Sequence, residues 1–488
     1  MRRFKKRWLA YTFIAAWIAV GAWNASRPLP EGLNVSSPPA FSDGANMKFL
    51  ADRTFNDLSG REQREQQIFN AVFDIVDHAE RFVVADFFLF NSDTGAATSV
   101  HRRLSSELAQ HLLARKLVKS GLTVLVITDP INEVYGGKHS AMLDDLRDAG
   151  IDVVTTDLSQ LRDSNPAYSA LWRMFIQWFG NAPDRGRLSN PFGGPPNITL
   201  RSWLALLNFK ANHRKVVVAD RADGGMVALV TSANPHDASS AHSNVGMQVE
   251  GDIAHDILAS ELAVARFSGW QGTLPEPARQ EAREPANAVQ ASYVTEAAIR
   301  DHLLQSFAAA RHGDAIRIAM FYLADRKIVA ALLDAANRGV AVKLILDPNK
   351  DAFGRRKDGV PNRPVANELV SKGGGNIEVR WYRTHGEQFH TKLALVSRDD
   401  RLITSVGSAN FTRRNLGAYN LEANLAVDMP LTAPLAKLML GYFDDLWSNS
   451  AVGGKDPQFT APFGAYEDKD RSRYWRYRVM EATGVSTF

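Results

Sequence analysis

The 488-residue chain contains no cysteine. Disulfide bridges, thiolate metal sites and cysteine nucleophiles are therefore excluded, and cysteine usage says nothing about the redox compartment. An excess of charge of one sign is also lacking, because 57 Lys and Arg against 53 Asp and Glu leave a net charge of only +4. This mildly basic balance suits a phosphate-bearing substrate but does not distinguish lipid from nucleic acid.

A long apolar run stands at the N-terminus. Five basic residues lie within the first seven positions, and Trp8 to Trp23 are uncharged and mostly apolar, which is typical of a signal anchor or a signal peptide. At about 1.5 Å per residue the run spans roughly 24 Å, short of a bilayer core unless it extends to Ala25. Trp17 and Trp23 favour an uncleaved anchor, since such rings lie at membrane interfaces. We expect a membrane-anchored protein whose catalytic region is non-cytoplasmic (periplasmic or extracellular), or a secreted one if the segment is cleaved.

Strand-like and helix-like segments alternate in both halves of the chain. With 45% hydrophobic and 9% aromatic residues, the chain can form a large core, and its length predicts two domain-sized units. The alternation predicts an α/β fold with helices on both faces of a sheet. Strands are expected at 82–90, 122–128, 316–323 and 341–346, and helices at 63–79, 99–119, 140–149, 296–311 and 327–337.

Two similar pieces indicate that the halves are related. SGLTVLVITDP at Ser120 to Pro130 matches RGVAVKLILDP at Arg338 to Pro348 at a constant offset of 218 positions, whereas His213 and His390 differ by 177. The first unit therefore holds 41 additional residues between its Asp-Pro turn and its histidine. Most of them must lie within Leu158 to Phe209.

This insert is rich in aromatic side chains. Ser164 or Asn165 is a candidate helix cap, and Pro166 would occupy the first turn. The aromatic and apolar residues that follow cover too much of a helix circumference for an ordinary surface helix. Either the insert is an apolar lid or membrane-facing entrance for acyl chains, or it is an extra core helix packed on the sheet. The residues concerned are Tyr168, Leu171, Trp172, Phe175, Ile176, Trp178 and Phe179.

A histidine and a lysine lie two positions apart near the start of a predicted hairpin in the second half. His390 and Lys392 precede the apolar run 393–396, and a second run, 402–406, ends in Gly407-Ser408-Ala409-Asn410. Residues i and i+2 of a strand point to the same face, so both polar groups should project together. The hairpin would bring the hydroxyl and the carboxamide beside them.

The same constellation occurs in the first half. His213 and Lys215 precede the strand-like run 216–219 and Asp220, and a second run, 226–230, leads to Thr231-Ser232-Ala233-Asn234. A nucleophile or proton donor, a fixed cation and hydrogen-bonding groups are what a phosphodiester site requires. Two such sets in one chain predict a phosphodiester site.

These residues resemble the phospholipase D superfamily, whose mark is H-x-K-x4-D followed by G-S-x-N, present twice. The first copy departs from the pattern in having Thr231 in place of the glycine, and the second has Ser397 where the aspartate would be. The resemblance spans roughly Met47 to Ser448. It implies two similar α/β units around a pseudo-twofold axis, with both His-Lys-Asn sets in one shared active-site cleft.

The expected divisions follow from the resemblance and from composition. Stretches rich in Pro, Ser and Gly or in Pro, Ala and charge, at Arg27 to Asp43 and Pro275 to Ala288, have the composition of connecting segments. The tail could touch lipid headgroups or nucleic acid, or pack across the domain surface with Arg stems over its rings. We expect a signal segment at 1–26, a tether at 27–46, a first unit at 47–272 with the insert at 158–209, a linker at 273–290, a second unit at 291–450 and the tail at 451–488.

The resemblance also implies roles for the site residues. His213 would attack phosphorus to form a phosphohistidine, and His390 would protonate the leaving oxygen. Glu422 lies where the family places a carboxylate that orients the second histidine, whereas the partner of His213 is unidentified, with Glu250 as a candidate. Asp220 would be supportive, and neither a metal nor a cofactor is expected. Phosphate binding would fall to Lys215, Lys392, Ser232, Asn234, Ser408 and Asn410.

Three hypotheses about function remain open at this stage. The first is a phospholipid enzyme, either a phospholipase D-type hydrolase or a phosphatidyltransferase of the cardiolipin synthase type, with membrane contact through the N-terminal segment and the insert. The second keeps the catalytic pair but takes DNA or RNA as substrate, as in the superfamily's small nucleases. The third is a non-catalytic phosphate-binding scaffold. The sequence does not predict an oligomeric state.

Overall fold

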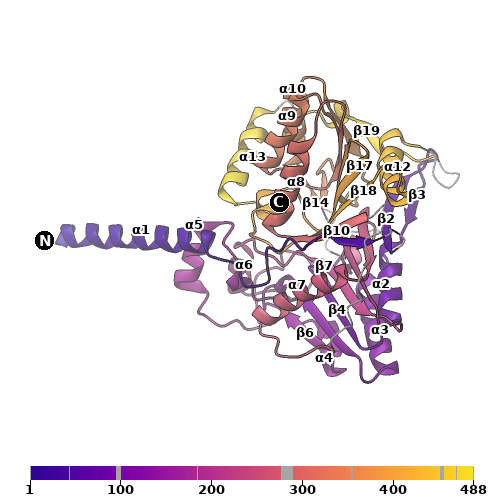
Figure 1. The fold of residues 1–488 in the computed structure, drawn as a ribbon. Coiled ribbons are helices and arrows are strands. Elements are labelled where there is room, and N and C mark those ends of the chain that lie inside the picture. Colours follow the sequence, from indigo (N-terminus) through magenta and orange to yellow (C-terminus); the bar gives the residue numbers. More distant parts are fainter. Residues whose placement is uncertain are drawn as a thin grey trace.

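The computed structural model describes residues 2–488 except 43, 45, 95–100, 184, 276–288, 353–354, 451–455, 469 and 487. Two large mixed sheets lie one above the other, and a single long helix projects away from them (Figure 1).

The first sheet has eight strands in the order β3-β2-β9-β8-β7-β4-β5-β6. Strands β4, β5 and β6 are parallel, whereas β7 pairs antiparallel with β4 and continues through β8 and β9. Its strands are β2 Met47–Asn56, β3 Glu62–Glu65, β4 Phe82–Phe87, β5 Thr123–Thr128, β6 Asp152–Thr155, β7 Lys215–Asp220, β8 Met226–Thr231 and β9 Asn244–Glu250, and its helices are α2 Ile68–Asp77, α3 Leu104–Val118, α4 Ala141–Asp148 and α7 Ile253–Phe267.

The second sheet has nine strands in the order β1-β10-β18-β17-β16-β11-β12-β15-β19. Its strands are β1 Ala40–Ser42, β10 Val289–Thr295, β11 Ala315–Met320, β12 Ala341–Leu346, β15 Ile377–Tyr382, β16 Lys392–Arg398, β17 Arg401–Gly407, β18 Ala423–Pro430 and β19 Thr460–Pro462. Its helices are α8 Ala297–Ala309, α9 Arg326–Asn337, α10 Asn362–Lys372, α11 Arg413–Leu416, α12 Pro434–Ser448 and α13 Arg471–Thr483.

The two sheets share one strand order. The run β2-β9-β8-β7-β4-β5-β6 of the first corresponds to β10-β18-β17-β16-β11-β12-β15 of the second, with parallel and antiparallel pairs in the same places. The predicted α/β class is confirmed. Because β7 and β16 are equivalent, both His-Lys pairs begin a strand that lies in the interior of its sheet.

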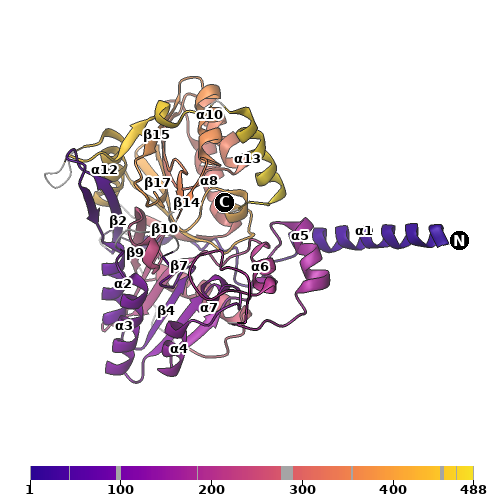
Figure 2. The ribbon, with the colours of Figure 1, turned by 180° about the vertical axis from the view of Figure 1, so that it is seen from behind.

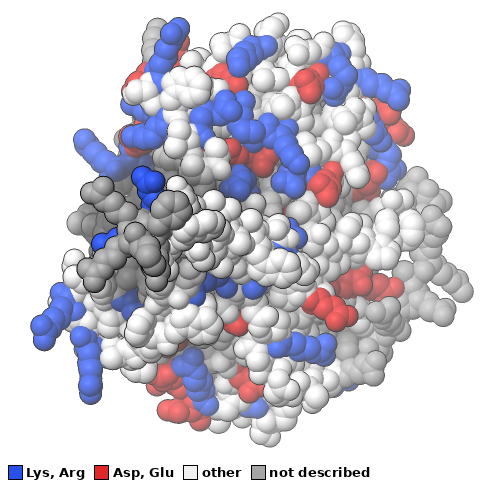
Figure 3. Space-filling model, turned by 90° about the vertical axis from the view of Figure 1, so that its left-hand side faces the viewer, with Lys and Arg blue, Asp and Glu red and all other residues white. Residues whose placement is uncertain are grey.

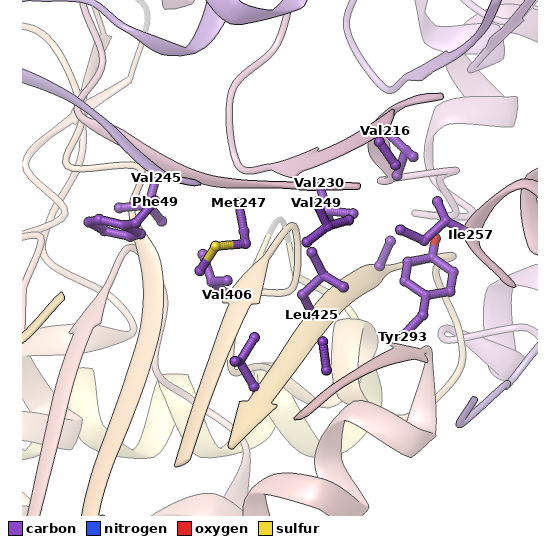
Figure 4. Packing of buried hydrophobic residues seen from close by; sticks show 14 of the residues in the cluster. Phe49, Val216, Val230, Val245, Met247, Val249, Ile257, Tyr293, Val406 and Leu425 are labelled. Atoms are coloured by element: carbon purple, nitrogen blue, oxygen red, sulfur yellow. The ribbon is translucent and has the colours of Figure 1, made fainter. Parts of the chain in front are cut away.

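A shared apolar core joins the two sheets. Phe49, Val230 and Met247 of the first sheet belong to one buried cluster with Val406 and Leu425 of the second (Figure 4). Helices α7 and α12 contribute to the same cluster. The outer face of the first sheet is covered by α2, α3 and α4, and that of the second by α8, α9 and α10. Helices therefore lie on both faces of the sheets, as expected, but on the inner faces α7 and α12 share the core with the opposite sheet.

The predicted strands and helices are present, but two helices start later than predicted. The helix expected at 99–119 begins at Leu104, and residues 99 and 100 lie outside the described ones. The helix expected at 63–79 begins only at Ile68, because Glu62–Glu65 forms β3 and pairs with β2. Arg53 and Glu65 lie opposite each other in that pairing and form an ion pair of 2.8 Å. The helical spacing belongs to Ile68, Val72 and Val76, which are buried against the sheet.

The stretch expected to be a tether instead lies along the second sheet. Ala40–Ser42 forms β1 and pairs with β10, while the backbone N–H groups of Asn34 and Val35 donate to the side chains of Glu296 and Thr295. Most of the expected linker, 276–288, lies outside the described residues.

In the tail, α13 packs on the second sheet's helices with Tyr477 buried, and Arg478 lies 5.7 Å from the ring centre of Tyr474. The expectation that Arg side chains cover the rings of the tail is confirmed there.

A buried ion cluster links the first sheet to the start of α8. Arg214 is fully buried, and its guanidinium contacts Glu261 of α7 at 3.0 Å and Glu296 at 2.8 Å. Tyr293 of β10 donates to Glu261 at 2.6 Å. Glu296 also accepts from the backbone N–H of Glu422 at 3.1 Å, so the cluster reaches the site described below.

Removing the cation of this cluster should destabilise the protein strongly. Arg214→Met leaves two buried carboxylates without their partner, which typically costs about 3–5 kcal/mol. Urea unfolding of the full chain measures this cost. Arg221→Met is the matched control, because Arg221 pairs with Glu250 near the surface and such pairs contribute roughly 0–1 kcal/mol. Equal losses in the two variants would contradict the prediction.

Candidate active site

Both His-Lys pairs occupy the same place at the start of an interior strand. Lys215 is the first residue of β7 and Lys392 the first of β16. Each histidine stands two residues earlier, in extended chain just before its strand. Each ammonium group donates to the carbonyl of its own histidine, at 2.5 Å for Lys215 and 2.8 Å for Lys392. The predicted hairpins are present as β7-β8 and β16-β17.

An aromatic ring packs against each pair. The ring centre of Phe88 lies 4.9 Å from that of His213 and 5.2 Å from the Nζ of Lys215. Phe321 repeats this arrangement, at 5.1 Å from His390 and 5.2 Å from the Nζ of Lys392. These two rings follow directly after β4 and β11. The sequence holds a hint of these rings, since both expected strands contain two adjacent aromatic residues near their C-terminal ends, Phe87-Phe88 and Phe321-Tyr322.

Each histidine is oriented by a residue from the opposite half of the chain. The Nδ1 of His213 lies 2.8 Å from Oε1 of Glu422, which directly precedes β18. The Nδ1 of His390 lies 3.1 Å from Oδ1 of Asn244, the first residue of β9. The expectation that Glu422 orients His390 is therefore corrected. Glu250, the candidate partner of His213, instead pairs with Arg221 at 2.5 Å.

Two backbone contacts hold this crossed arrangement together. The N–H of His213 donates to the carbonyl of Leu421 at 2.9 Å, and the N–H of Ser243 donates to the carbonyl of Gln388 at 3.1 Å. Leu421 directly precedes Glu422, and Ser243 directly precedes Asn244. Each hydrogen bond therefore joins the neighbour of an orienting residue to the segment of the histidine that it orients. Each half of the chain therefore needs the other to complete its own His set.

The repeated Asp-Pro turns hold the segments that lead into the histidines. Oδ2 of Asp129 accepts from the N–H of Asn212 at 2.7 Å, and Oδ2 of Asp347 accepts from the N–H of Phe389 at 2.8 Å. Burial raises the pKa of Asp129 to about 7 and that of Asp347 to about 6. The Asp-Pro repeat, offset by 218 positions, therefore supplies two carboxylates that each bind the backbone N–H of the residue before a histidine.

The two motif serines hold the orienting residues. The hydroxyl of Ser232 donates to Oδ1 of Asn244 at 3.0 Å, and that of Ser408 donates to Oε2 of Glu422. Each serine oxygen also accepts a backbone N–H from the following strand. The expectation that these hydroxyls bind phosphate therefore gives way to a positioning role, because their hydrogen-bonding capacity is used within the protein.

The two motif asparagines follow β8 and β17 and differ in their hydrogen bonds. Oδ1 of Asn234 accepts from the N–H of Leu89 at 3.2 Å. Oδ1 of Asn410 is buried and has no hydrogen-bond partner among the described residues. Such an unused polar group is costly unless a ligand or water satisfies it. The Oδ1 of Asn410 can therefore accept from a donor such as a water or an alcohol hydroxyl, whereas a hydrogen bond to a phosphate oxygen would have to come from its Nδ2 group.

The site is rich in basic groups and has one closely paired carboxylate. Burial lowers the pKa of Lys215 to about 7, and burial together with Lys215 holds the pKa of Lys392 well below its usual range. Burial raises the pKa of Glu422, but His213 and Lys215 outweigh it and the net shift is downward. Glu422 is therefore ionised. A bound phosphodiester anion would favour the charged form of both lysines.

Both histidines are neutral without a ligand. Burial lowers the pKa of His213 to about 4 against the opposing effect of Glu422, and burial with Lys392 lowers the pKa of His390 well below its ordinary value. A neutral His213 whose Nδ1–H faces the Glu422 carboxylate carries its lone pair on Nε2. This is the form that a nucleophile requires.

A third histidine that the sequence reasoning missed lies beside His390. The ring centre of His242 is 5.9 Å from that of His390, and its Nδ1 accepts the N–H of Gln388 at 3.2 Å. Its ring hydrogen therefore lies on Nε2, and burial lowers its pKa to about 3. The only sequence signal was its position two residues before Asn244, within a polar run between two strands.

Asp220 lies at the opposite end of β7 from Lys215, about 17 Å away for five residues of strand. Its carboxylate accepts the backbone N–H groups of Glu80, Arg81 and Phe82, at 2.8 to 3.2 Å, and the Arg81 side chain at 2.9 Å. The structure thus corrects its assignment to the catalytic set. Asp220 fixes the start of β4 against the end of β7.

Removal of this carboxylate should affect stability and leave the chemistry intact. Asp220→Ala removes the buried acceptor of three backbone N–H groups and leaves them without a partner. We expect this to lower the free energy of unfolding by about 2–4 kcal/mol. Denaturant unfolding and a turnover assay on the folded variant check this. Asp223→Ala in the following turn is a mild control, since its carboxylate accepts one exposed N–H. A large loss of turnover in folded Asp220→Ala would return this residue to the catalytic set.

Comparison with known proteins agrees with this geometry. Residues 303–447 match the family model described as "Cardiolipin synthase, PLD-like domain". Cardiolipin synthase B of Escherichia coli (strain K12) is 34% identical over 234 residues, covering 45% of this chain and 52% of that protein. Cardiolipin synthase A of Pseudomonas entomophila (strain L48) is 25% identical over 408 residues, covering 80% of this chain and 69% of that protein.

A solved structure shows the same fold over almost the whole chain. The crystal structure of phosphatidylserine synthase from Haemophilus influenzae Rd KW20 superposes with a TM-score of 0.54 at 11% identity, covering 93% of this chain and 97% of that one. The chain is thus an α/β protein with two similarly ordered sheets and two crossed His-Lys sets. Its second half and its site motifs are similar to those of the phospholipase D superfamily. It spans about half the length of the first curated relatives that it matches.

Proposed function

We propose that this protein is a phosphatidyltransferase or phospholipase D-type phosphodiesterase acting on phospholipids through a phosphohistidine. The observation that carries the proposal is the crossed pairing of His213 with Glu422 and of His390 with Asn244. This pairing supports one site built from both halves of the chain, with two imidazoles and two lysines close enough to influence one another's pKa. The similarity to cardiolipin synthases supports a phospholipid as the substrate.

The unequal partners of the two histidines support unequal roles. When Nε2 of His213 attacks phosphorus, its imidazole becomes cationic, and the Glu422 carboxylate stabilises that charge. A bound phosphodiester anion would favour protonation of His390. Because the neutral carboxamide of Asn244 does not stabilise that charge, protonated His390 would be the stronger acid and would give its proton to the leaving oxygen. This supports His213 as nucleophile and His390 as general acid.

The remaining steps use the same groups in reverse. An alcohol or water gives its proton to His390 and attacks phosphorus, the phosphorus–Nε2 bond breaks, and His213 is released. Lys215, Lys392, Asn234 and Asn410 would bind the non-bridging oxygens throughout the displacement. An alcohol acceptor gives transfer and water gives hydrolysis.

The N-terminal helix supports a location at the membrane. Helix α1 Arg2–Ser26 contains one stretch, Lys6–Ser26, that is long and apolar enough to cross a bilayer. We propose that α1 anchors the protein and that the two sheets lie on the non-cytoplasmic side, since the basic residues stand at its N-terminal end.

Lipid chromatography tests the proposed function. The purified full chain is incubated with phosphatidylglycerol vesicles in EDTA, with and without added glycerol. We expect release or exchange of the headgroup, because no step uses a metal ion, and a dependence on glycerol separates transfer from hydrolysis. Cleavage of plasmid DNA with the lipid untouched would replace this proposal by a nuclease. Loss of activity on chelation would contradict the metal-free displacement.

A further inference from the structure

One face of α1 packs against the aromatic insert. In the insert, α5 Pro166–Leu171 has Asn165 at its N-cap position and continues into a π-helical turn, Trp172–Ile176. The Nε1 of Trp17 donates to the carbonyl of Ala167 at 2.7 Å, and the rings of Phe13 and Phe175 stack with centres 6.1 Å apart. The insert therefore contacts α1 well before the helix ends at Ser26.

The close approach of the two helices depends on a glycine. A methyl group added at Gly21 would lie 3.2 Å from the carbonyl oxygen of Pro166 and 3.7 Å from the Cβ of Ala170. Phe13, Trp17 and Gly21 are spaced by four residues and so lie on one side of α1. Figures 1 and 2 both show α5 against the C-terminal part of α1, while the rest of that helix projects from the body.

These contacts fix the level of the insert along α1. Trp17 lies nine residues before Ser26, or about 14 Å along a helix, and Phe13 lies about 20 Å before it. Both positions fall inside the stretch Lys6–Ser26 that could cross a membrane. If α1 spans the bilayer, the part of the insert that touches Trp17 and Phe13 must enter the bilayer with it.

The insert displays the side chains that such a position requires. Phe175, Trp178 and Phe179 are 51%, 76% and 68% exposed. Three large apolar groups this close together on a surface indicate an interaction site. Phe175 stacks on Phe13 of α1, and that helix carries further exposed apolar residues, Trp8, Leu9, Ile14 and Ile18. The exposed surfaces of helix and insert together form one apolar face.

Basic side chains flank this apolar face. Arg185 and Arg187 of the insert are exposed, as is Arg471 of α13. Helix α13 lies on the same side of the molecule as α1 in both ribbon views. Viewed from that side, the surface has a central uncharged region with Lys and Arg gathered beside it (Figure 3). Arginine next to exposed aromatic rings suits the anionic headgroups at a bilayer surface.

We propose that residues 166–179 of the insert are a second membrane element that sinks beside α1 into an anionic phospholipid bilayer, with Phe175, Trp178 and Phe179 in the acyl region. This rests on the proposed function, since it assumes a bilayer as the source of substrate. The insert that contains this element ends at Phe209, four residues before His213. The interpretation as a lid or membrane-facing entrance is thereby preferred to that of a core helix.

The absence of cysteine allows a direct measurement of depth. Trp178→Cys in the full chain carries the only thiol, and a nitroxide attached there reports its surroundings after reconstitution into phosphatidylcholine–phosphatidylglycerol vesicles. Leu117→Cys is the matched control, because Leu117 is an exposed apolar residue, 85% exposed, at the end of α3. We expect the label at 178 to collide with oxygen and to be protected from a water-soluble nickel chelate, and the label at 117 to show the reverse.

Each outcome decides the proposal. Access of the nickel chelate at 178 equal to that at 117 would place the insert in water and overturn it, and protection from both reagents would indicate a protein partner and also overturn it. The lipid assay on the same samples is read separately. A lipid-embedded label in a protein without activity on lipids would support the membrane element and refute the proposed function. An active protein with a water-exposed label would support the proposed function and refute the membrane element.

Discussion

Replacement of His213 by alanine is expected to lower the rate of headgroup release or exchange by at least about 10³, and His390→Ala should do the same. The first variant lacks the atom that forms the bond to phosphorus, and the second lacks the proton carrier. His78→Ala is the matched control, because His78 is an exposed surface residue that pairs with Asp74. Turnover on phosphatidylglycerol vesicles measures all three.

A substrate with a better leaving group should separate the two roles. Phosphatidyl-p-nitrophenol needs little protonation of its leaving oxygen, so His390→Ala should release nitrophenol in a burst and accumulate the phosphohistidine at His213. His213→Ala should give no burst, since no other group takes its place. A burst in His213→Ala and none in His390→Ala would reverse the assignment. Full activity of both variants would refute a phosphohistidine mechanism at this site.

Loss of the Glu422 carboxylate should have the second largest effect. Glu422→Gln keeps the shape but removes the charge that stabilises the His213 cation. Ser408 donates to Oε2 and Asn415 to Oε1, so in either orientation the new amide N–H₂ faces one of these donors. We expect turnover to fall by about 10²-fold or more, by analogy with the loss of the aspartate in a catalytic triad. Glu250→Gln is the matched control, since Glu250 pairs with Arg221 outside the site.

A substitution at Asn244 tests whether the difference between the partners of the two histidines sets their pKa values. Asn244→Asp places a carboxylate beside His390, which favours the protonated imidazole and raises its pKa. Because the general acid must be protonated, the alkaline limb of the kcat profile should move to higher pH. An unchanged pH profile, or a Glu422→Gln rate equal to that of Glu250→Gln, would show that the crossed partners do not tune the histidines.

Local patterns determined much of the architecture. The strands that carry Lys215 and Lys392 were predictable because an apolar run between a polar motif and a turn has few alternatives to an interior strand. The Asp-Pro repeat was also visible in sequence. Its role was not visible, because the hydrogen bond that the N–H of Asn212 donates to Asp129 joins residues 83 positions apart. No local pattern encodes such a contact.

The predictions for Glu422 and Asp220 were wrong because each side chain binds a segment that is distant in sequence. Glu422 was assigned to the histidine of its own half, whereas it lies against His213, 209 positions away. The motif position of Asp220 suggested a catalytic group, yet three backbone N–H groups of another strand occupy its carboxylate. A buried carboxylate binds wherever donors are available, and the sheet order decides which donors those are.

The sequence by itself determined the residue types of the site, the two His-Lys pairs and the strands that carry them, because these depend on chemistry and on short-range periodicity. Only the tertiary structure decided that each half orients the histidine of the other, and that the aromatic insert lies against α1. Both outcomes depend on how two sheets pack face to face across a shared core, which buries charged groups and selects their partners through space.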